Sequence, residues 1–134
     1  MVQFLSEEWV ALAKQRVLDE LDPRKDLKSV SGSFLLIVSN IPPTATTMSW
    51  FLSVTNGRLS TMIVDQGVTS TSTAEFTVMG NYETFTQIMR GEMSIVVALI
   101  KNRVQFKGDM LKAYGFIQPI DKIIECLRKI ATEF

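Results

Sequence analysis

The stretch TMSWFLSVTNGRLSTMIVD, residues 47–65, contains two strand-like segments on either side of one tight turn. Large apolar residues occupy every second position of its first half: Met48, Trp50, Leu52 and Val54. This alternation is typical of a half-buried β-strand. The dipeptide Asn56-Gly57 follows, and it favours the hairpin turn in which both central residues have positive φ. We therefore predict two antiparallel strands, over residues 47–55 and 59–65, paired through this turn.

Three further segments have the composition of strands. Residues 34–38, Phe-Leu-Leu-Ile-Val, form a continuous apolar run that is typical of a central strand covered on both faces. Residues 73–78 alternate polar and apolar side chains, and residues 103–107 do so again. A Thr- and Ser-rich stretch around residues 67–72 predicts a loop before the fourth strand. The chain thus predicts a three-strand meander followed by two later strands.

Helices are predicted at both ends of the chain. Ser6 followed by two glutamates is a helix-start signal, because its hydroxyl can cap the first turn and acids favour the positive end of the helix dipole. The apolar stripe of this first helix consists of Trp9, Leu12, Ala13, Val17 and Leu21. The last helix is predicted to begin at Pro119 and to run to the end of the chain, with the stripe Ile120, Ile123, Ile124, Leu127, Ile130, Ala131 and Phe134.

Shorter helices are predicted between the later strands. Asn81 and Asp109 can cap helices over residues 82–89 and 110–114, and Gly91 is placed to end the first of them in the left-handed conformation. Residues 93–100 are apolar on nearly every side, so this helix has to be buried, in the core or against an apolar partner outside the chain. Together these elements predict an α+β fold, a five-stranded and mostly antiparallel sheet with helices packed on it.

The composition excludes several kinds of function. The chain has 134 residues, no histidine, a single cysteine, Cys126, and a formal net charge of 0. This length predicts one domain over residues 1–134, and the neutral charge argues against a nucleic-acid partner. Without histidine or a second cysteine we predict no catalytic residue, no metal and no cofactor. The lone cysteine and the short apolar runs predict a cytoplasmic protein.

Two segments resemble the sterol carrier protein 2 family, in its small stand-alone prokaryotic form. Residues 4–9, Phe-Leu-Ser-Glu-Glu-Trp, resemble the start of such proteins. Residues 81–110 resemble their most recognisable stretch, a short helix, a glycine, an apolar helix and a basic strand ending in Lys107-Gly108-Asp109. Lys101-Asn102 replaces the usual Gly-Lys before that strand, so Asn102 is predicted to take the left-handed conformation. The resemblance implies an apolar tunnel for a fatty acyl chain, a sterol or an isoprenoid-like lipid.

The walls of such a tunnel are expected to be apolar, with few polar groups. Methionines suit a cavity that accepts ligands of different shape, and aromatic and aliphatic residues of the predicted elements can provide the rest of the wall. The predicted ligand-binding residues are Trp50, Leu52, Met62, Phe85, Ile88, Met89, Met93, Val97, Phe106, Met110, Tyr114, Phe116, Ile120 and Ile124. Each of them could equally be an ordinary core residue.

These observations favour a non-enzymatic lipid-binding or carrier protein, with the last helix opening as a lid because it is terminal and amphipathic. A local excess of basic residues is consistent with transient contact with a membrane surface, or with a solvated strand face: Lys101, Arg103, Lys107 and Lys112 against Asp109. The alternative is an accessory or assembly domain whose apolar surface binds a partner protein or a second copy, as a homodimer. An enzyme acting on acyl groups has no nameable catalytic residue in this chain.

Overall fold

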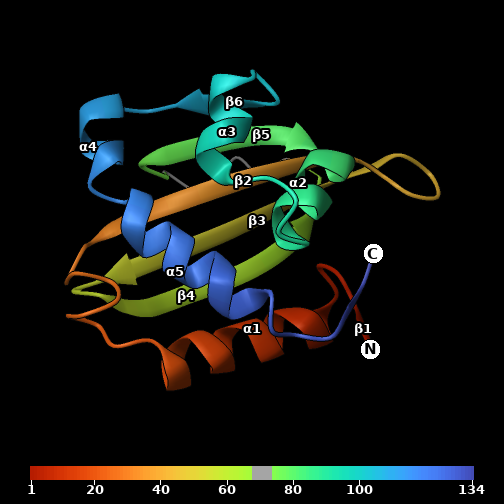
Figure 1. Cartoon of the computed structure of the whole chain (residues 1–134). Helices are drawn as coiled ribbons and strands as arrows, with labels where there is room; N and C mark the ends of the chain where they lie inside the picture. Colours follow the sequence, from red (N-terminus) through yellow and green to blue (C-terminus); the bar gives the residue numbers. More distant parts are fainter. Residues whose placement is uncertain (68–73) are drawn as a thin grey trace.

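The central sheet has five strands: β2 (Gly32–Ile41), β3 (Thr46–Thr55), β4 (Arg58–Gln66), β5 (Phe76–Asn81) and β6 (Val104–Lys107). In this computed structural model, which describes residues 1–67 and 74–134, their spatial order is β4-β3-β2-β5-β6 (Figure 1). β2 and β5 pair in parallel, and the other neighbours are antiparallel. The α+β class and the meander with two later strands are confirmed. The predicted loop at 67–72 lies almost wholly outside the described residues.

The hairpin between β3 and β4 forms at the predicted turn. Asn56 and Gly57 both have positive φ, 50° and 80°, and β3 continues directly into β4. Trp50 lies opposite Leu36 of β2 and Val64 of β4, so the alternating apolar positions of the meander share one face. β2 is the central strand, as predicted.

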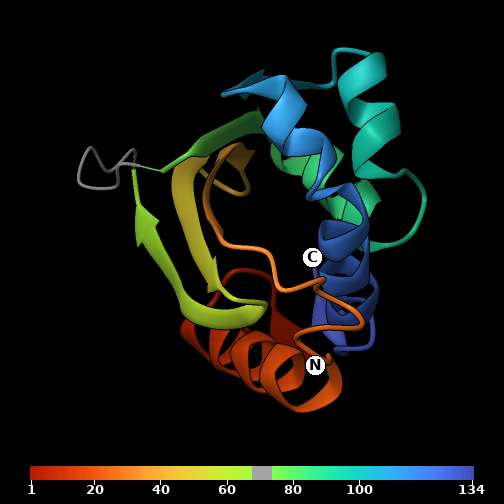
Figure 2. The same ribbon diagram turned by 90° about the vertical axis from the view of Figure 1, so that its left-hand side faces the viewer.

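Helices cover one face of the sheet, and the expectation that β2 is covered on both faces is wrong for the described residues. Figure 2 shows the helices on the concave side of the curved sheet. Phe34 and Val38 point to this side and are buried. Leu35 and Ile37 point to the other side, where they lie opposite Phe51 and Met79 in neighbouring strands. The run is continuously apolar because these cross-strand pairs shield one another on the open face.

The first helix, α1 (Glu7–Glu20), is capped by Ser6, whose Oγ accepts a hydrogen bond from the Trp9 backbone N–H at 3.2 Å. Its buried positions are Trp9, Val10, Ala13 and Val17. Leu12, predicted in the buried stripe, is 40% exposed, because α1 packs against both β4 and the last helix and turns Val10 inward in its place. Trp9 packs edge to face on Trp50, with 5.4 Å between ring centroids, and this contact joins the helix to the sheet.

Two short helices follow β5. α2 (Tyr82–Met89) is capped by the Asn81 side chain, and Gly91, which follows the C-cap Arg90, has the predicted left-handed conformation with φ 82°. α3 (Ile95–Ile100) is shorter than predicted, because Ser94 caps it and Met93 belongs to the preceding loop. The structure contradicts the first alternative, burial in the core: Ala98 is the one buried residue of this helix, and Ile100 is 75% exposed. A helix of six residues beside the edge strand β6 has too few neighbours to cover all of its sides.

The C-terminal part departs from the prediction at both ends. α4 (Met110–Tyr114) is capped by Asp109 as predicted, but α5 (Ile117–Leu127) begins two residues before Pro119 and stops seven residues before the end of the chain. Pro119 is tolerated in the first turn because no helical hydrogen bond requires its missing N–H. Beyond α5 the chain reverses into β7 (Thr132–Glu133), which pairs in parallel with β1 (Val2–Gln3).

Side-chain contacts hold this terminal segment in place. The Trp9 indole donates a hydrogen bond to the Thr132 hydroxyl at 3.0 Å, and the Arg128 guanidinium donates two to the Ile88 carbonyl at 2.8 and 3.1 Å. Both termini therefore lie side by side against the helical layer (Figure 1). Asn102, with φ 56°, takes the left-handed conformation predicted for it.

The turn glycine offers a test of the meander. We predict that Gly57→Ala lowers the free energy of unfolding by about 2–3 kcal/mol, because the new Cβ would lie 2.0 Å from the Pro23 carbonyl oxygen at a φ that disfavours side chains. Gly67→Ala is the matched control, since Gly67 has φ 78° with no described atom within 4 Å of that Cβ position. It is expected to cost about 1 kcal/mol. Urea unfolding measures both, and equal losses would contradict the contribution of the Pro23 contact.

Candidate functional site

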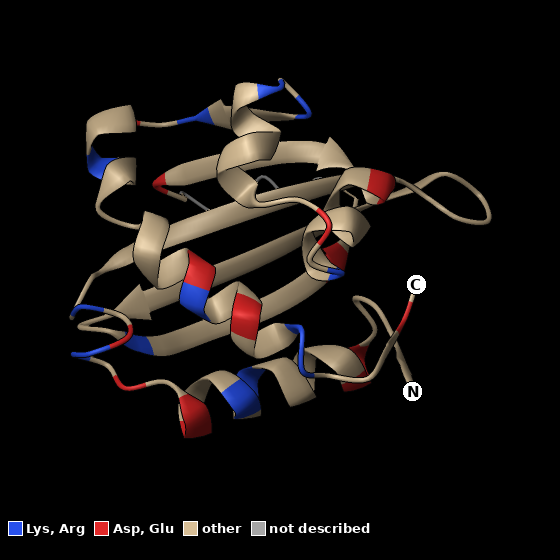
Figure 3. Cartoon of the chain, in the orientation of Figure 1, with Lys and Arg blue, Asp and Glu red and all other residues tan. Residues whose placement is uncertain are grey.

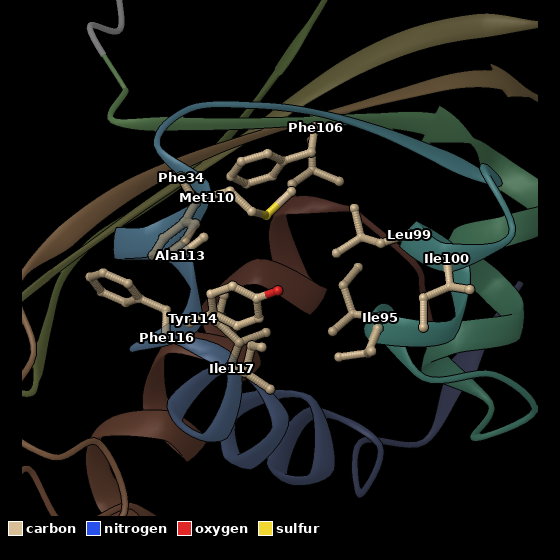
Figure 4. A pocket seen from close by; sticks show the side chains of 13 residues that line it. Phe34, Ile95, Leu99, Ile100, Phe106, Met110, Ala113, Tyr114, Phe116 and Ile117 are labelled. Atoms are coloured by element: carbon tan, nitrogen blue, oxygen red, sulfur yellow. The ribbon is translucent and has the colours of Figure 1, made fainter.

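An apolar cavity lies between the sheet and the helices α3, α4 and α5. This outer cavity has a volume of about 340 Å³ (Figure 4). The sheet provides its floor, α3 one wall, and α4 with the start of α5 the facing wall. It is lined by Phe34, Val78, Ile95, Val96, Leu99, Ile100, Phe106, Met110, Ala113, Tyr114, Phe116, Ile117 and Ile120.

The lining of the outer cavity carries no charged side chain. Its one polar side-chain group is the Tyr114 hydroxyl, which Figure 4 shows directed toward Ile95 across the cavity. Tyr114 is 65% exposed, so this hydroxyl lies near the opening to solvent. A cavity of this kind provides no general base, nucleophile or ion pair, and it suits a hydrocarbon ligand with at most one polar group near the opening.

Stacked aromatic rings build the floor. Phe34 and Phe76 lie on neighbouring strands with 5.2 Å between ring centroids, and Phe116, just before α5, packs against both at 5.1 and 5.4 Å. Gly32 makes this possible, because a Cβ there would lie 2.6 Å from Cζ of Phe116. The rings thus hold the start of α5 against the sheet, next to the outer cavity that Phe34 and Phe116 line.

A second, inner cavity of about 70 Å³ lies farther along α5. It is lined by Phe34, Leu36, Trp50, Leu52, Val78, Phe85, Ile88, Met89, Ile95, Ile120, Ile123, Ile124 and Leu127. Four of these residues, Phe34, Val78, Ile95 and Ile120, also line the outer cavity. The two cavities are thus neighbours that share a wall, and this wall is formed by two sheet residues and two helix residues.

Eleven of the fourteen predicted residues line one or both cavities. Phe106, Met110, Tyr114 and Phe116 line the outer cavity, and Ile120 lines both. The inner cavity is lined by Trp50, Leu52, Phe85, Ile88, Met89 and Ile124. Three predicted residues lie elsewhere: Met62 is buried against α1, Met93 is half-buried in the loop before α3, and Val97 points away on α3.

Sequence reasoning missed several residues that line the outer or the inner cavity. Phe34 and Leu36 could have been found, since they share the period-two face of the predicted Trp50 and Leu52 through the pairing of β2 and β3. The α3 residues carry no such signal, because a segment that is apolar on every side does not indicate which side faces a cavity. Ile117 lies in the first turn of α5, whose start the sequence placed two residues too late, whereas Ala113 lies in α4, which forms over the predicted residues.

Apart from the Tyr114 hydroxyl, no titratable side chain of the described residues lines either cavity. Burial raises the pKa of the Cys126 thiol, and the Glu20 carboxylate raises it further, so the thiol stays protonated at neutral pH and is a poor nucleophile. Among residues 1–67 and 74–134, no group of three His, Cys, Asp or Glu residues is arranged to hold a metal ion. Within the same residues, no helix has the length and apolarity that crossing a membrane requires.

Comparison with known structures identifies the fold. A conserved hypothetical protein from Thermus thermophilus is 17% identical, with a TM-score of 0.83 over 99% of this chain and 93% of its own. A crystal structure of sterol carrier protein 2 is 17% identical, with a TM-score of 0.82 over 96% of this chain and 100% of its own. Palmitated SCP2L2 from Aedes aegypti is 21% identical, with a TM-score of 0.56 over 91% of this chain and 94% of its own.

The sequence itself places the chain in a family. No curated protein matches it significantly. The family profile of the SCP-2 sterol transfer family matches residues 10–121, which include most of α1, the five-stranded sheet and every residue that lines the outer cavity. This match contains the second of the two segments that carried the resemblance, residues 81–110, and begins directly after the first, residues 4–9. The chain therefore belongs to the SCP-2 sterol transfer family.

Proposed function

We propose that this protein is a non-enzymatic carrier that binds one lipid molecule, with its hydrocarbon chain in the outer cavity and its polar end near Tyr114. The observation that carries the proposal is the lining of the outer cavity, thirteen residues without a charged side chain. Family membership and the palmitated relative from Aedes aegypti support it. A fatty acyl, sterol or isoprenoid-like lipid meets the chemical requirement, and the reducing cytoplasm is the compartment that suits the unpaired Cys126.

Desolvation supplies the free energy of binding. Each methylene group moved from water into an apolar cavity gains about 0.8 kcal/mol, before the costs of ordering the chain are subtracted. The cavity walls can contribute this gain without any polar contact. The Tyr114 hydroxyl can exchange one hydrogen bond with an alcohol, ester or carboxyl group at the opening, worth about 1 kcal/mol. Such a site selects hydrocarbon over polar molecules and discriminates weakly among head groups.

The moving part that admits the lipid is α4 in this proposal, rather than the terminal helix. α5 has four buried residues, Pro119, Ile123, Cys126 and Leu127, and the segment after it is held by Arg128 and β7. α4 has no buried residue and a single ion pair to the sheet, from the Lys112 Nζ to the Glu75 carboxylate at 3.7 Å. Few buried contacts make a segment the first to open. Deleting residues 118–134 would remove core residues and does not test a lid.

Filling the outer cavity tests the proposal. We predict that Ala113→Trp lowers the affinity for a fluorescent fatty acid by about tenfold or more, because the indole would occupy the ligand's space. Fluorescence titration measures the affinity. Native mass spectrometry of the freshly purified wild-type protein, followed by solvent extraction, should show a bound lipid that the variant lacks.

The matched control is Gln118→Trp, since Gln118 is exposed at the start of α5 and lines neither cavity. It should bind as the wild type does. Urea unfolding separates loss of the site from loss of the fold: a ring that enters an empty cavity is neutral or stabilising, whereas a ring forced into a packed core costs about 1–3 kcal/mol. Equal binding by the two variants would contradict the proposed site.

The shared wall generates a prediction about chain length. Along a series of saturated fatty alcohols, wild-type affinity should rise about fourfold per methylene until the outer cavity is full, then level off. We predict that Ile120→Ala moves this plateau to longer chains, because the shortened side chain connects the two cavities. Ile117→Ala removes the same atoms from the outer cavity alone, and its plateau should stay at the wild-type length. An unchanged plateau in Ile120→Ala would mean that the wall does not limit the ligand.

A further inference from the structure

An exposed apolar patch surrounds the opening of the outer cavity. Nine large apolar side chains are exposed among the described residues, and five of them belong to α3 and α4. These five, which we call the mouth patch, are Val97, Ile100, Met110, Leu111 and Tyr114. Ile100, Met110 and Tyr114 line the cavity as well, while Leu111 is 82% exposed and lines neither cavity. A five-residue helix with three large apolar side chains and no buried residue is costly in water.

Basic residues fringe the mouth patch. Lys101 and Arg103 follow α3, Lys107 ends β6 and Lys112 belongs to α4, and all four are exposed. Figure 3 shows this basic rim along the turn after α3, β6 and α4. The acidic residues of the rim are Glu75, which pairs with Lys112, and Asp109, which caps α4. Four basic residues against two acidic ones make this rim positive on a chain whose net charge is 0.

We propose that the mouth patch docks on the surface of an anionic lipid bilayer, with Leu111 and Ile100 in the acyl boundary and the basic rim against the head groups. The surface of such a bilayer has an anionic outer layer and an apolar layer beneath it. The basic rim matches the anionic layer, and the apolar mouth patch matches the layer beneath. The opening of the cavity then faces the bilayer, and a lipid can pass between the two without crossing water. The passage of a lipid between cavity and bilayer rests on the proposed function, but the docking of the mouth patch on the bilayer does not.

The positive charge of the basic rim argues against a second copy of this chain as the partner that covers the mouth patch. In a symmetric dimer the same patch lies on both sides of the interface, so the positive rims of the two chains would lie close to each other. Juxtaposed like charges oppose association, whereas phosphate head groups neutralise them. The anionic bilayer is therefore the partner that satisfies both the apolar and the charged part of this surface.

Vesicle flotation tests the proposal with the full chain. The probes are vesicles of phosphatidylcholine alone and of three parts phosphatidylcholine to one part phosphatidylglycerol, at low and at raised ionic strength. We expect binding to the anionic vesicles that weakens with salt. Leu111→Ser should reduce it by about tenfold. The triple variant Lys101→Gln, Arg103→Gln and Lys107→Gln should reduce it by about fivefold for each charge removed.

The chain provides a matched control on another face. Leu12 and Leu18 of α1 are 40% and 46% exposed, so Leu12→Ser with Leu18→Ser removes exposed apolar surface away from the mouth patch and should leave vesicle binding unchanged. Insertion is read directly by an environment-sensitive dye on Leu111→Cys, because the natural Cys126 is buried and does not react. Its emission should shift to the blue on anionic vesicles, and the same dye on Leu12→Cys should not respond.

Several outcomes would overturn the docking proposal. The first is that the protein does not float with anionic vesicles at low salt, and the second is that it binds equally to both kinds of vesicle. The third is that Leu12→Ser with Leu18→Ser reduces vesicle binding as much as Leu111→Ser does. A concentration-dependent dimer that Leu111→Ser dissociates would assign the patch to a second copy instead. Lipid uptake from solution separates this proposal from the carrier function, because Leu111→Ser should keep the wild-type affinity for fluorescent fatty acid while slowing its transfer from vesicles. Loss of uptake in every variant and in the wild type would contradict the carrier function alone.

Discussion

The packing of Phe116 against the sheet is the contact on which the site depends. Its ring meets Phe34 and Phe76 at the floor of the outer cavity, over the space left by Gly32. This contact sets where α5 begins, and thereby where the short α4 has to end. From this point α5 crosses the sheet toward α1, and the area near β6 is left to the short α3 and α4, which do not fill it. The cavity is the space that these two helices leave uncovered.

α5 therefore contributes side chains both to the hydrophobic core and to the walls of the two cavities. Its last two turns provide Ile123, Cys126 and Leu127 to the core, and the chain after it is held by Arg128 and by pairing with the N-terminal strand. Its first turns present Ile117 and Ile120 to the cavities. A helix that is fixed at one end and lines the cavities at the other keeps the wall of the proposed lipid site rigid, and a rigid wall lowers the entropic cost of binding.

The sequence was most informative where a local rule acts alone. Strand alternation, the Asn56-Gly57 turn and the caps Ser6, Asn81 and Asp109 depend on neighbouring residues, and all of them form as predicted. The sequence failed where distant segments decide the outcome. Nothing in residues 128–134 indicates that they leave the helix to pair with residues 2–3, and a wholly apolar α3 does not reveal that one of its sides faces solvent.

In the docking proposal, the exposure of α3 and α4 and the presence of the cavity have the same physical explanation. A lipid that passes from an apolar cavity into water loses the desolvation gain of its chain, so the more tightly a lipid is bound, the more slowly it is released into solution. An opening bordered by apolar side chains that meet a bilayer removes this barrier, because the lipid stays in apolar surroundings throughout. Under this proposal, the apolar residues that are exposed around Tyr114 in the isolated protein are the ones that allow lipid transfer.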